Sequence, residues 1–223
     1  MGQVMYIENI LKQLGPGLYG ITGPAGSGKT SLARRLGNAL EAGVYSSDLR
    51  FIGSSQDRKE LLYRKQKSSI EDYIDAANQF NWWDWDTILE DLQGLSSGKQ
   101  IVLKNGYDRD KGVTIPDCIV SPFSFTLYEG AILGPPIILS KLRKVIYVHT
   151  APEIRFNRLV AKDHNRRSFR EIAARFLITE YSESKAYEQL FAWYRDNVIF
   201  VNDQGEETLY NPQAQPNFIP IAV

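Results

Sequence analysis

Short apolar runs alternate along the chain with longer segments in which apolar residues recur every three or four positions. The short runs predict buried strands, and the longer segments predict amphipathic helices. Strands are expected at 18–22, 43–45, 100–104, 123–128, 144–149 and 197–201. Helices are expected at 29–41, 57–79, 84–95, 135–142, 152–162 and 168–194, after an amphipathic helix within 4–14. This alternation predicts an α/β fold with a mainly parallel sheet, whose ligands gather beyond the carboxyl ends of the strands.

The strand expected at 18–22 leads directly into the sequence GPAGSGKT, residues 23–30. This sequence matches the phosphate-binding pattern G-x-x-x-x-G-K-[ST], in which glycines turn the backbone N–H groups towards phosphate oxygens. Lys29 can reach the outer phosphates, and the Thr30 hydroxyl can ligate Mg²⁺. A strand before the pattern and a helix after it disfavour a simple connecting turn, so we expect a nucleoside triphosphate to bind here. The residues expected to bind it are Gly23, Pro24, Ala25, Gly26, Ser27, Gly28, Lys29, Thr30 and Ser31.

Composition narrows the class of protein. The chain has 223 residues, and its 26 Lys and Arg residues balance 26 Asp and Glu residues, so no basic field indicates nucleic acid. Cys118 is the only cysteine, which excludes an intramolecular disulfide and a cysteine zinc cluster. No apolar run is long enough to span a membrane, and the first one carries charges, unlike a signal peptide. We therefore expect one cytoplasmic domain over 1–223, with a core at about 15–201, a tail at 202–223 and no nucleic-acid or membrane partner; a homo-oligomer stays open.

Two carboxylates follow predicted strands. Asp48 comes after Ser46 and Ser47, where it could accept a proton from a hydroxyl or hold Mg²⁺, although a helix-capping role is equally compatible with its position. Glu129 ends another apolar run. Because a buried strand rarely ends in an idle carboxylate, a role for Glu129 in the Mg²⁺ site is favoured over a surface position.

Cations are concentrated between residues 155 and 170: Arg155, Arg158, Lys162, Arg166, Arg167 and Arg170. Such a run is often only a solvated helix face. Here only Glu153 and Asp163 lie among the cations, which favours a mobile arginine-rich lid that stabilises a transferring phosphoryl group.

The segment 80–86, FNWWDWD, contains three of the four tryptophans and two carboxylates. We expect the tryptophans to belong to the core or to an oligomer contact, which is the usual place of clustered aromatic residues. Asp84 and Asp86 could each bind substrate, and the pattern leaves this role and a purely structural one equally open.

In this order, the features resemble the uridine kinase and phosphoribulokinase group of P-loop small-molecule kinases, most closely the uridine/cytidine kinases, from about residue 18 to 201. The phosphate loop is the most specific match. The other matches are Ser46-Ser47-Asp48, Phe80-Asn81 with Asp84-Trp85-Asp86, Gly98-Lys99, Tyr107-Asp108, Glu129-Gly130, and the lid series Arg155, Arg158, Lys162, Asp163 and Arg167.

The resemblance implies a P-loop kinase fold with a five-stranded sheet, a small antiparallel flap at about 100–116 and an Arg-rich lid. It also implies transfer of the γ-phosphoryl group of ATP to a hydroxyl, such as a nucleoside 5′-OH, with Mg²⁺. Asp48 would be the catalytic base, assisted by Lys29, Arg158, Lys162 and Arg167. Thr30, Asp48 and Glu129 would hold Mg²⁺. The residues implied to bind the acceptor are Asp48, Asp84, Asp86, Tyr107, Glu129 and Arg155.

The departures from the family pattern fall on the acceptor side. Residues 108–112, DRDKG, lack the histidine with which the family reads a pyrimidine base, and Trp82-Trp83-Asp84 replaces His-Pro-Asp. In the lid, Ser168-Phe169 replaces Gly-Arg. The acceptor could therefore be a modified nucleoside, nicotinamide riboside, pantothenate, glycerate or a phosphorylated sugar. A nucleotide-dependent regulatory protein, or a relative that only binds its ligand, is the alternative to a kinase.

Overall fold

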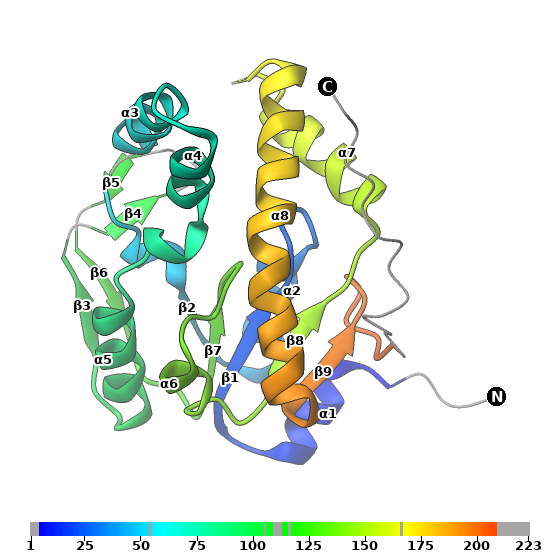
Figure 1. Cartoon of the computed structure of the whole chain (residues 1–223). Coiled ribbons are helices and arrows are strands. Elements are labelled where there is room, and N and C mark those ends of the chain that lie inside the picture. Colours follow the sequence, from blue (N-terminus) through cyan, green and yellow to red (C-terminus); the bar gives the residue numbers. More distant parts are fainter. Residues whose placement is uncertain are drawn as a thin grey trace.

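The fold is built around a five-stranded sheet with the strand order β2-β7-β1-β8-β9 (Figure 1). The computed structural model describes residues 5–53, 55–104, 106–108, 113–115, 117–165 and 167–208. Every neighbouring pair of strands in this sheet is parallel, as predicted. The strands are β1 (Gly17–Thr22), β2 (Gly43–Ser46), β7 (Phe125–Glu129), β8 (Val145–Val148) and β9 (Val198–Val201).

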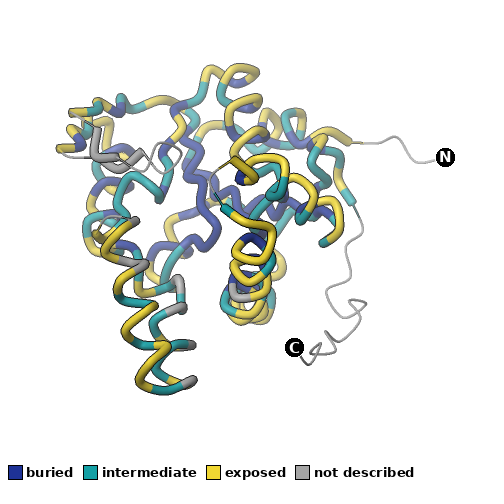
Figure 2. The backbone as a smooth tube through the Cα atoms, turned by 90° about the horizontal axis from the view of Figure 1, so that it is seen from above, coloured by how far each residue is buried: buried dark blue, intermediate teal, exposed yellow. Residues whose placement is uncertain are grey.

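Helices cover both faces of the sheet, and the alternation of side chains along each strand divides the core into two layers. On one face Tyr19 and Ile21 pack with α1 (Ile7–Leu14) and α2 (Lys29–Leu40). On the other face Leu18 belongs to a second cluster, whose helices are α5 (Trp85–Ser96), α6 (Pro136–Leu139) and α8 (Phe169–Tyr194). The buried residues consequently run through the middle of the molecule (Figure 2).

The long helix predicted at 57–79 is wrong, because the chain forms two helices there, α3 (Ser55–Gln66) and α4 (Ile70–Ala77). Ser69 interrupts the helix: its side chain accepts a hydrogen bond of 3.0 Å from the Asp72 amide and so caps α4. Serine competes in this way with helix continuation. The remaining helical elements are η1 (Ser47–Arg50), η2 (Gln79–Trp82), α7 (Pro152–Asp163) and η3 (Arg195–Asn197).

The predicted antiparallel flap is present and consists of two strand pairs. β3 (Ile101–Leu103) pairs with β6 (Cys118–Val120), and β4 (Gly106–Asp108) pairs with β5 (Val113–Ile115). The flap therefore extends beyond the predicted limit at residue 116. β4 lies alongside η1, so the flap contacts the segment that follows β2.

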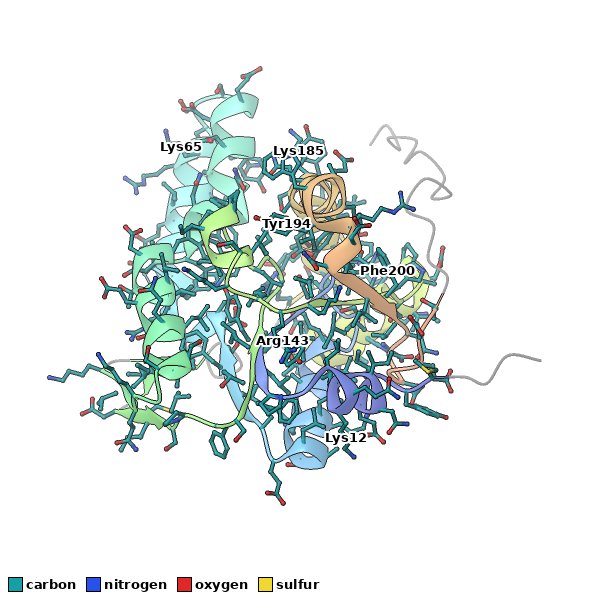
Figure 3. All side chains as sticks on the ribbon, turned by 90° about the horizontal axis from the view of Figure 1, so that it is seen from below. Lys12, Lys65, Arg143, Lys185, Tyr194 and Phe200 are labelled. Carbon is teal, nitrogen blue, oxygen red and sulfur yellow. The ribbon has the colours of Figure 1, made fainter. Side chains whose placement is uncertain are left out.

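The Arg143 side chain lies at the edge of the sheet where the parallel strands begin. Arg143 lies over the start of β1 and donates a hydrogen bond of 2.6 Å to the Pro16 carbonyl, whereas Lys12, Lys65 and Lys185 lie at the periphery (Figure 3). The first part of the predicted tail packs near α1, where the Glu207 amide donates to the Met5 carbonyl. Residues 209–223 lie outside the described residues. Among the described helices, none has the length and apolar character needed to cross a membrane.

Candidate active site

The phosphate loop connects the carboxyl end of β1 to the first residue of α2. Gly26 and Gly28 adopt φ angles of 80° and 95°, a region that side chains disfavour, and Gly28 is the N-cap of α2. The Ser27 amide donates to the Pro24 carbonyl at 3.0 Å, which turns the loop back on itself. The residues predicted to bind ATP thus lie in one loop that ends on a helix N-terminus, an arrangement suited to anions.

A buried carboxylate lies where the loop meets the neighbouring strands. Glu129, the last residue of β7, is opposite Ser46 in β2 and accepts a hydrogen bond of 2.7 Å from its hydroxyl. Its other oxygen accepts a hydrogen bond of 3.3 Å from the Thr30 hydroxyl. This donor set consists only of oxygen atoms, the type of ligand that Mg²⁺ prefers. Thr30, Ser46 and Glu129 therefore fit a magnesium site, and binding of Mg²⁺ by Thr30 and Glu129 stays a prediction.

Asp48 lies beside this cluster, in the first turn of η1. Burial, followed by the negative charges of Glu129 and Asp48, raises the pKa of the Tyr128 phenol well above its ordinary value. Both carboxylates consequently act on the same buried side chain. The backbone of Tyr107 in β4 is on the flap strand beside η1, while its side chain lies outside the described residues.

An unpredicted anchor holds η1 in place. The Asp91 carboxylate accepts hydrogen bonds from the Tyr45 hydroxyl at 2.6 Å and from Arg50 Nε at 2.7 Å. These two donors flank Asp48 in the chain, so Asp91 fixes the segment that carries it. The sequence held a signal for this contact: Asp91 follows the buried Ile88 by one helical turn and so lies on the apolar face of α5.

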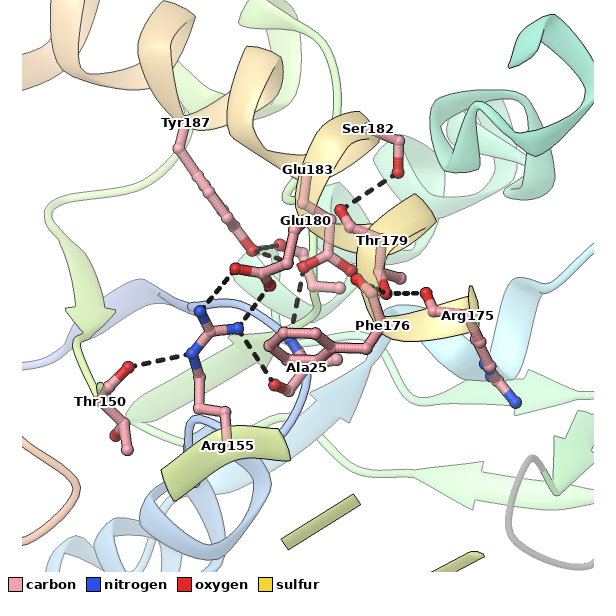
Figure 4. Close-up of polar contacts among 11 residues, drawn as sticks. Ala25, Thr150, Arg155, Arg175, Phe176, Thr179, Glu180, Ser182, Glu183 and Tyr187 are labelled. Atoms are coloured by element: carbon pink, nitrogen blue, oxygen red, sulfur yellow. Dashed lines mark hydrogen bonds and ion pairs between the residues drawn. The ribbon is translucent and has the colours of Figure 1, made fainter. Parts of the chain in front are cut away.

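Arg155 differs from its predicted role in substrate binding. Its side chain is only 2% exposed, and its two terminal nitrogens donate to Glu180 of α8 at 2.5 and 2.6 Å (Figure 4). Nε donates to the Thr150 carbonyl at 2.9 Å. A guanidinium that is buried and held at all three nitrogens has a structural role here, which contradicts the prediction.

Two other cations of the predicted lid form ion pairs, and one of their partners lies outside the cation-rich segment. Arg158 forms an ion pair with Asp203, in the turn after β9, and donates a hydrogen bond of 3.3 Å to the Gly26 carbonyl. Arg167 donates to Asp163 at 2.6 Å. Arg158 therefore lies over the phosphate loop, but with its charge balanced. Lys162 and Arg170 are exposed near the junction of α7 and α8, and Arg166 lies outside the described residues.

Asp84 and Asp86, the two residues of the tryptophan-rich segment that are predicted to bind the acceptor, both lie at the start of α5. Asp84 is the N-cap of α5 and accepts hydrogen bonds from the Thr87 amide at 3.1 Å and the Thr87 hydroxyl at 2.7 Å. These hydrogen bonds lower the pKa of the Asp84 carboxyl. Asp84 thus caps α5, and Asp86, two residues further on in the first turn of the helix, is also exposed, so substrate binding by either residue stays a prediction. Trp83 is 2% exposed and packs against Trp85 with ring centroids 5.4 Å apart, which confirms the structural interpretation of the tryptophans.

Comparisons with known proteins identify a family for this chain and solved structures with a similar fold. The model of the phosphoribulokinase / uridine kinase family matches residues 18–182. A "putative fructose transport system kinase" from Silicibacter sp. TM1040 aligns with a TM-score of 0.60 and 18% identity over 83% of this chain and 95% of that chain. D-glycerate 3-kinase from Cryptococcus neoformans var. grubii aligns with a TM-score of 0.52 and 12% identity over 93% of this chain and 90% of that chain. A "possible uridine kinase" from Bacillus stearothermophilus aligns with a TM-score of 0.49 and 20% identity over 81% of this chain and 94% of that chain. No curated protein sequence matches the chain.

Proposed function

The chain belongs to the phosphoribulokinase / uridine kinase family, and on that premise we propose that it transfers the γ-phosphoryl group of ATP to a hydroxyl group of a nucleoside-like or polyol acceptor. One observation carries the proposal: the Glu129 carboxylate joins the Thr30 hydroxyl at the phosphate loop to the Ser46 hydroxyl, two residues before Asp48. Nucleotide, metal and proton acceptor can therefore meet at one edge of the sheet.

The loop and the start of α2 bind the nucleotide in this proposal. Backbone amides of 24–30 hold the phosphates, and Lys29 places its charge on the outer ones. Thr30 and Glu129, together with Asp48, are the ligands that would hold Mg²⁺, which when bound supplies positive charge to the phosphates.

Asp48 accepts the proton of the acceptor hydroxyl as the phosphoryl group moves in line. Asp91 accepts hydrogen bonds from Tyr45 and Arg50, on either side of Asp48 in the chain, and so holds the segment that carries this carboxylate. Arg158, Lys162 and Arg167 stabilise the charge of the transferring group. For Arg158 and Arg167 this requires them to leave Asp203 and Asp163, so closing of the lid on substrate is part of the proposal.

The proposal leaves the identity of the acceptor substrate open. Asp86, in the first turn of α5, and Tyr107, in the flap, remain the candidates for binding acceptor hydroxyls. The absence of a histidine from residues 106–115 disfavours uridine, which leaves a modified nucleoside, nicotinamide riboside, pantothenate, glycerate or a sugar phosphate as candidate acceptors.

The proposal is tested with ATP labelled at the γ-phosphate. The purified protein is incubated with Mg²⁺ and each member of a panel of nucleosides, pantothenate, glycerate and sugar phosphates, and labelled acceptor and free phosphate are separated. We expect label on one class of acceptor at a rate at least tenfold above acceptor-free hydrolysis. Hydrolysis without transfer would support a regulatory ATPase instead.

A further inference from the structure

The backbone N–H and C=O of Ala25 in the phosphate loop are both connected to helix α8, the first directly and the second through Arg155 of α7 (Figure 4). The Ala25 N–H donates a hydrogen bond of 3.3 Å to Glu183 Oε2. The Ala25 carbonyl accepts one of 3.5 Å from Arg155, which Glu180 of the same helix holds. Glu183 is 1% exposed, so this carboxylate is buried against the loop.

Glu180 and Glu183 make different contacts. Both terminal nitrogens of Arg155 donate to Glu180. Glu183 accepts a hydrogen bond from the Ala25 amide and one of 3.5 Å from the Tyr187 hydroxyl, and its charge also attracts Arg155. An amide that binds a carboxylate oxygen offers the same charge-assisted hydrogen bond that it would offer to a phosphate oxygen.

Hydrogen bonds through Tyr187 also connect Glu183 to the segment that follows Glu129. Tyr187 donates a hydrogen bond of 2.6 Å to the Ala131 carbonyl, to which the Thr22 hydroxyl also donates at 2.8 Å. Ala131 is two residues beyond Glu129 in the chain. A carboxylate at this place repels the phosphates of ATP and competes with them for the Ala25 amide.

Resting on the proposed function, we propose that Glu183 is an autoinhibitory carboxylate that occupies the Ala25 amide until the phosphates of ATP displace it. α8 then sets the affinity of the loop for nucleotide, because each binding event must break the contact between Glu183 and Ala25. Removing the charge of Glu183 strengthens ATP binding, whereas a residue that merely supported the loop would weaken ATP binding when changed.

The test is the dissociation constant of Mg–ATP, measured by titration calorimetry on the full chain and on two glutamate variants. Glu183→Gln keeps the shape and the hydrogen-bond acceptor but removes the charge. Glu188→Gln makes the same change at an exposed position of the same helix and is the control. We expect Glu183→Gln to bind ATP roughly 3- to 30-fold more tightly, as a charge-assisted hydrogen bond becomes a neutral one, and Glu188→Gln to stay within about twofold.

An unchanged or weaker affinity of Glu183→Gln, with ATP bound by the parent chain, would overturn this inference and leave the proposed function intact. Absence of ATP binding by the parent and by both variants would overturn the two together. If Glu183→Gln does not fold, as judged by its thermal melt, Glu183→Asp takes its place. It withdraws the carboxylate from Ala25 by one methylene and is expected to tighten ATP binding by a smaller factor; a weaker affinity again overturns the inference.

Discussion

The Thr30 hydroxyl donates a hydrogen bond of 3.3 Å to the Glu129 carboxylate, although 99 residues separate the two in the chain. Thr30 is the second residue of α2 and Glu129 is the last residue of β7, the strand beside β1. The contact exists because parallel neighbours bring their carboxyl ends to the same edge of the sheet, where the phosphate loop also lies. The proposed kinase chemistry depends on this edge.

Asp48→Asn is expected to lower the rate of phosphoryl transfer by roughly 10²–10⁴, the usual contribution of a general base, while the affinity for ATP changes little. The variant keeps the size of the side chain and removes its ability to take a proton. Steady-state kinetics with the best acceptor, together with the dissociation constant of ATP, measure the two effects separately.

Asp84→Ala provides the contrast for Asp48. Since Asp84 caps α5 through Thr87, its loss should reduce the free energy of unfolding by about 0.5–2 kcal/mol. Transfer should continue at nearly the parent rate. If the loss of rate in Asp84→Ala matched that of Asp48→Asn, Asp84 would be a substrate ligand after all.

Gly26→Ala should destabilise the protein more than Gly98→Ala. Both glycines have a left-handed backbone, with φ near 80°. A Cβ at Gly26 would lie 2.7 Å from the Arg155 carbonyl oxygen, whereas nothing lies within 4 Å of a Cβ at Gly98. Gly98→Ala therefore measures the backbone cost alone, about 1–2 kcal/mol, and urea unfolding of both variants gives the extra cost of packing α7 on the loop. Equal losses would contradict the close approach.

His149 should make the fold less stable in mild acid. Burial, and then the neighbouring Arg155 guanidinium, hold the pKa of His149 below its ordinary value. Between that lowered pKa and about 6.5, the unfolded chain binds a proton that the folded chain does not. The contribution of the neutral His149 to the free energy of unfolding is therefore complete above about pH 6.5, and it is lost as the pH falls below that value towards the lowered pKa.

The measurement is the melting temperature of the parent, His149→Gln and His164→Gln between pH 5 and 8. His149→Gln should flatten the decline below pH 6.5, while the change at the exposed His164 should leave it in place. A decline of the same steepness in His149→Gln would show that other groups cause it.

Uridine and cytidine should be poor acceptors. A site that has lost a hydrogen-bonding partner for the base discriminates against it by on the order of 10²-fold in kcat/KM. The chain has two histidines, His149 and His164, and both lie outside the flap segment around Tyr107. The test compares kcat/KM for pyrimidine nucleosides with that for the other acceptors, and uridine as the best acceptor would refute the argument.

Local patterns were sufficient to predict the sheet and the phosphate loop. The apolar run before Gly23 and the helical spacing after Lys29 are contained in neighbouring residues, and so is the strand that ends at Glu129. The break at Ser69 was missed because the apolar spacing continues across it, while one side-chain hydrogen bond starts a new helix.

Pairings between distant residues could not be predicted in this way. The family resemblance implied that Arg155 binds substrate, and its ion pair could not be foreseen because its acidic partner, Glu180, lies 25 residues away on another helix. Asp203, which balances Arg158, lies in a turn that the pattern indicated only as a tail. An isolated charge on an apolar helix face, as at Asp91, is the one such contact that carried a local signal.

The most direct test of the phosphotransferase assignment is the balance of products with the best acceptor under Mg²⁺. Phosphorus NMR and mass spectrometry would follow ATP, ADP, free phosphate and the acceptor together. We predict one phosphate ester on an acceptor hydroxyl for each ADP formed, with both products lost in parallel in Asp48→Asn. Formation of ADP and free phosphate in equal amounts, with no ester on any acceptor tested, would contradict the account.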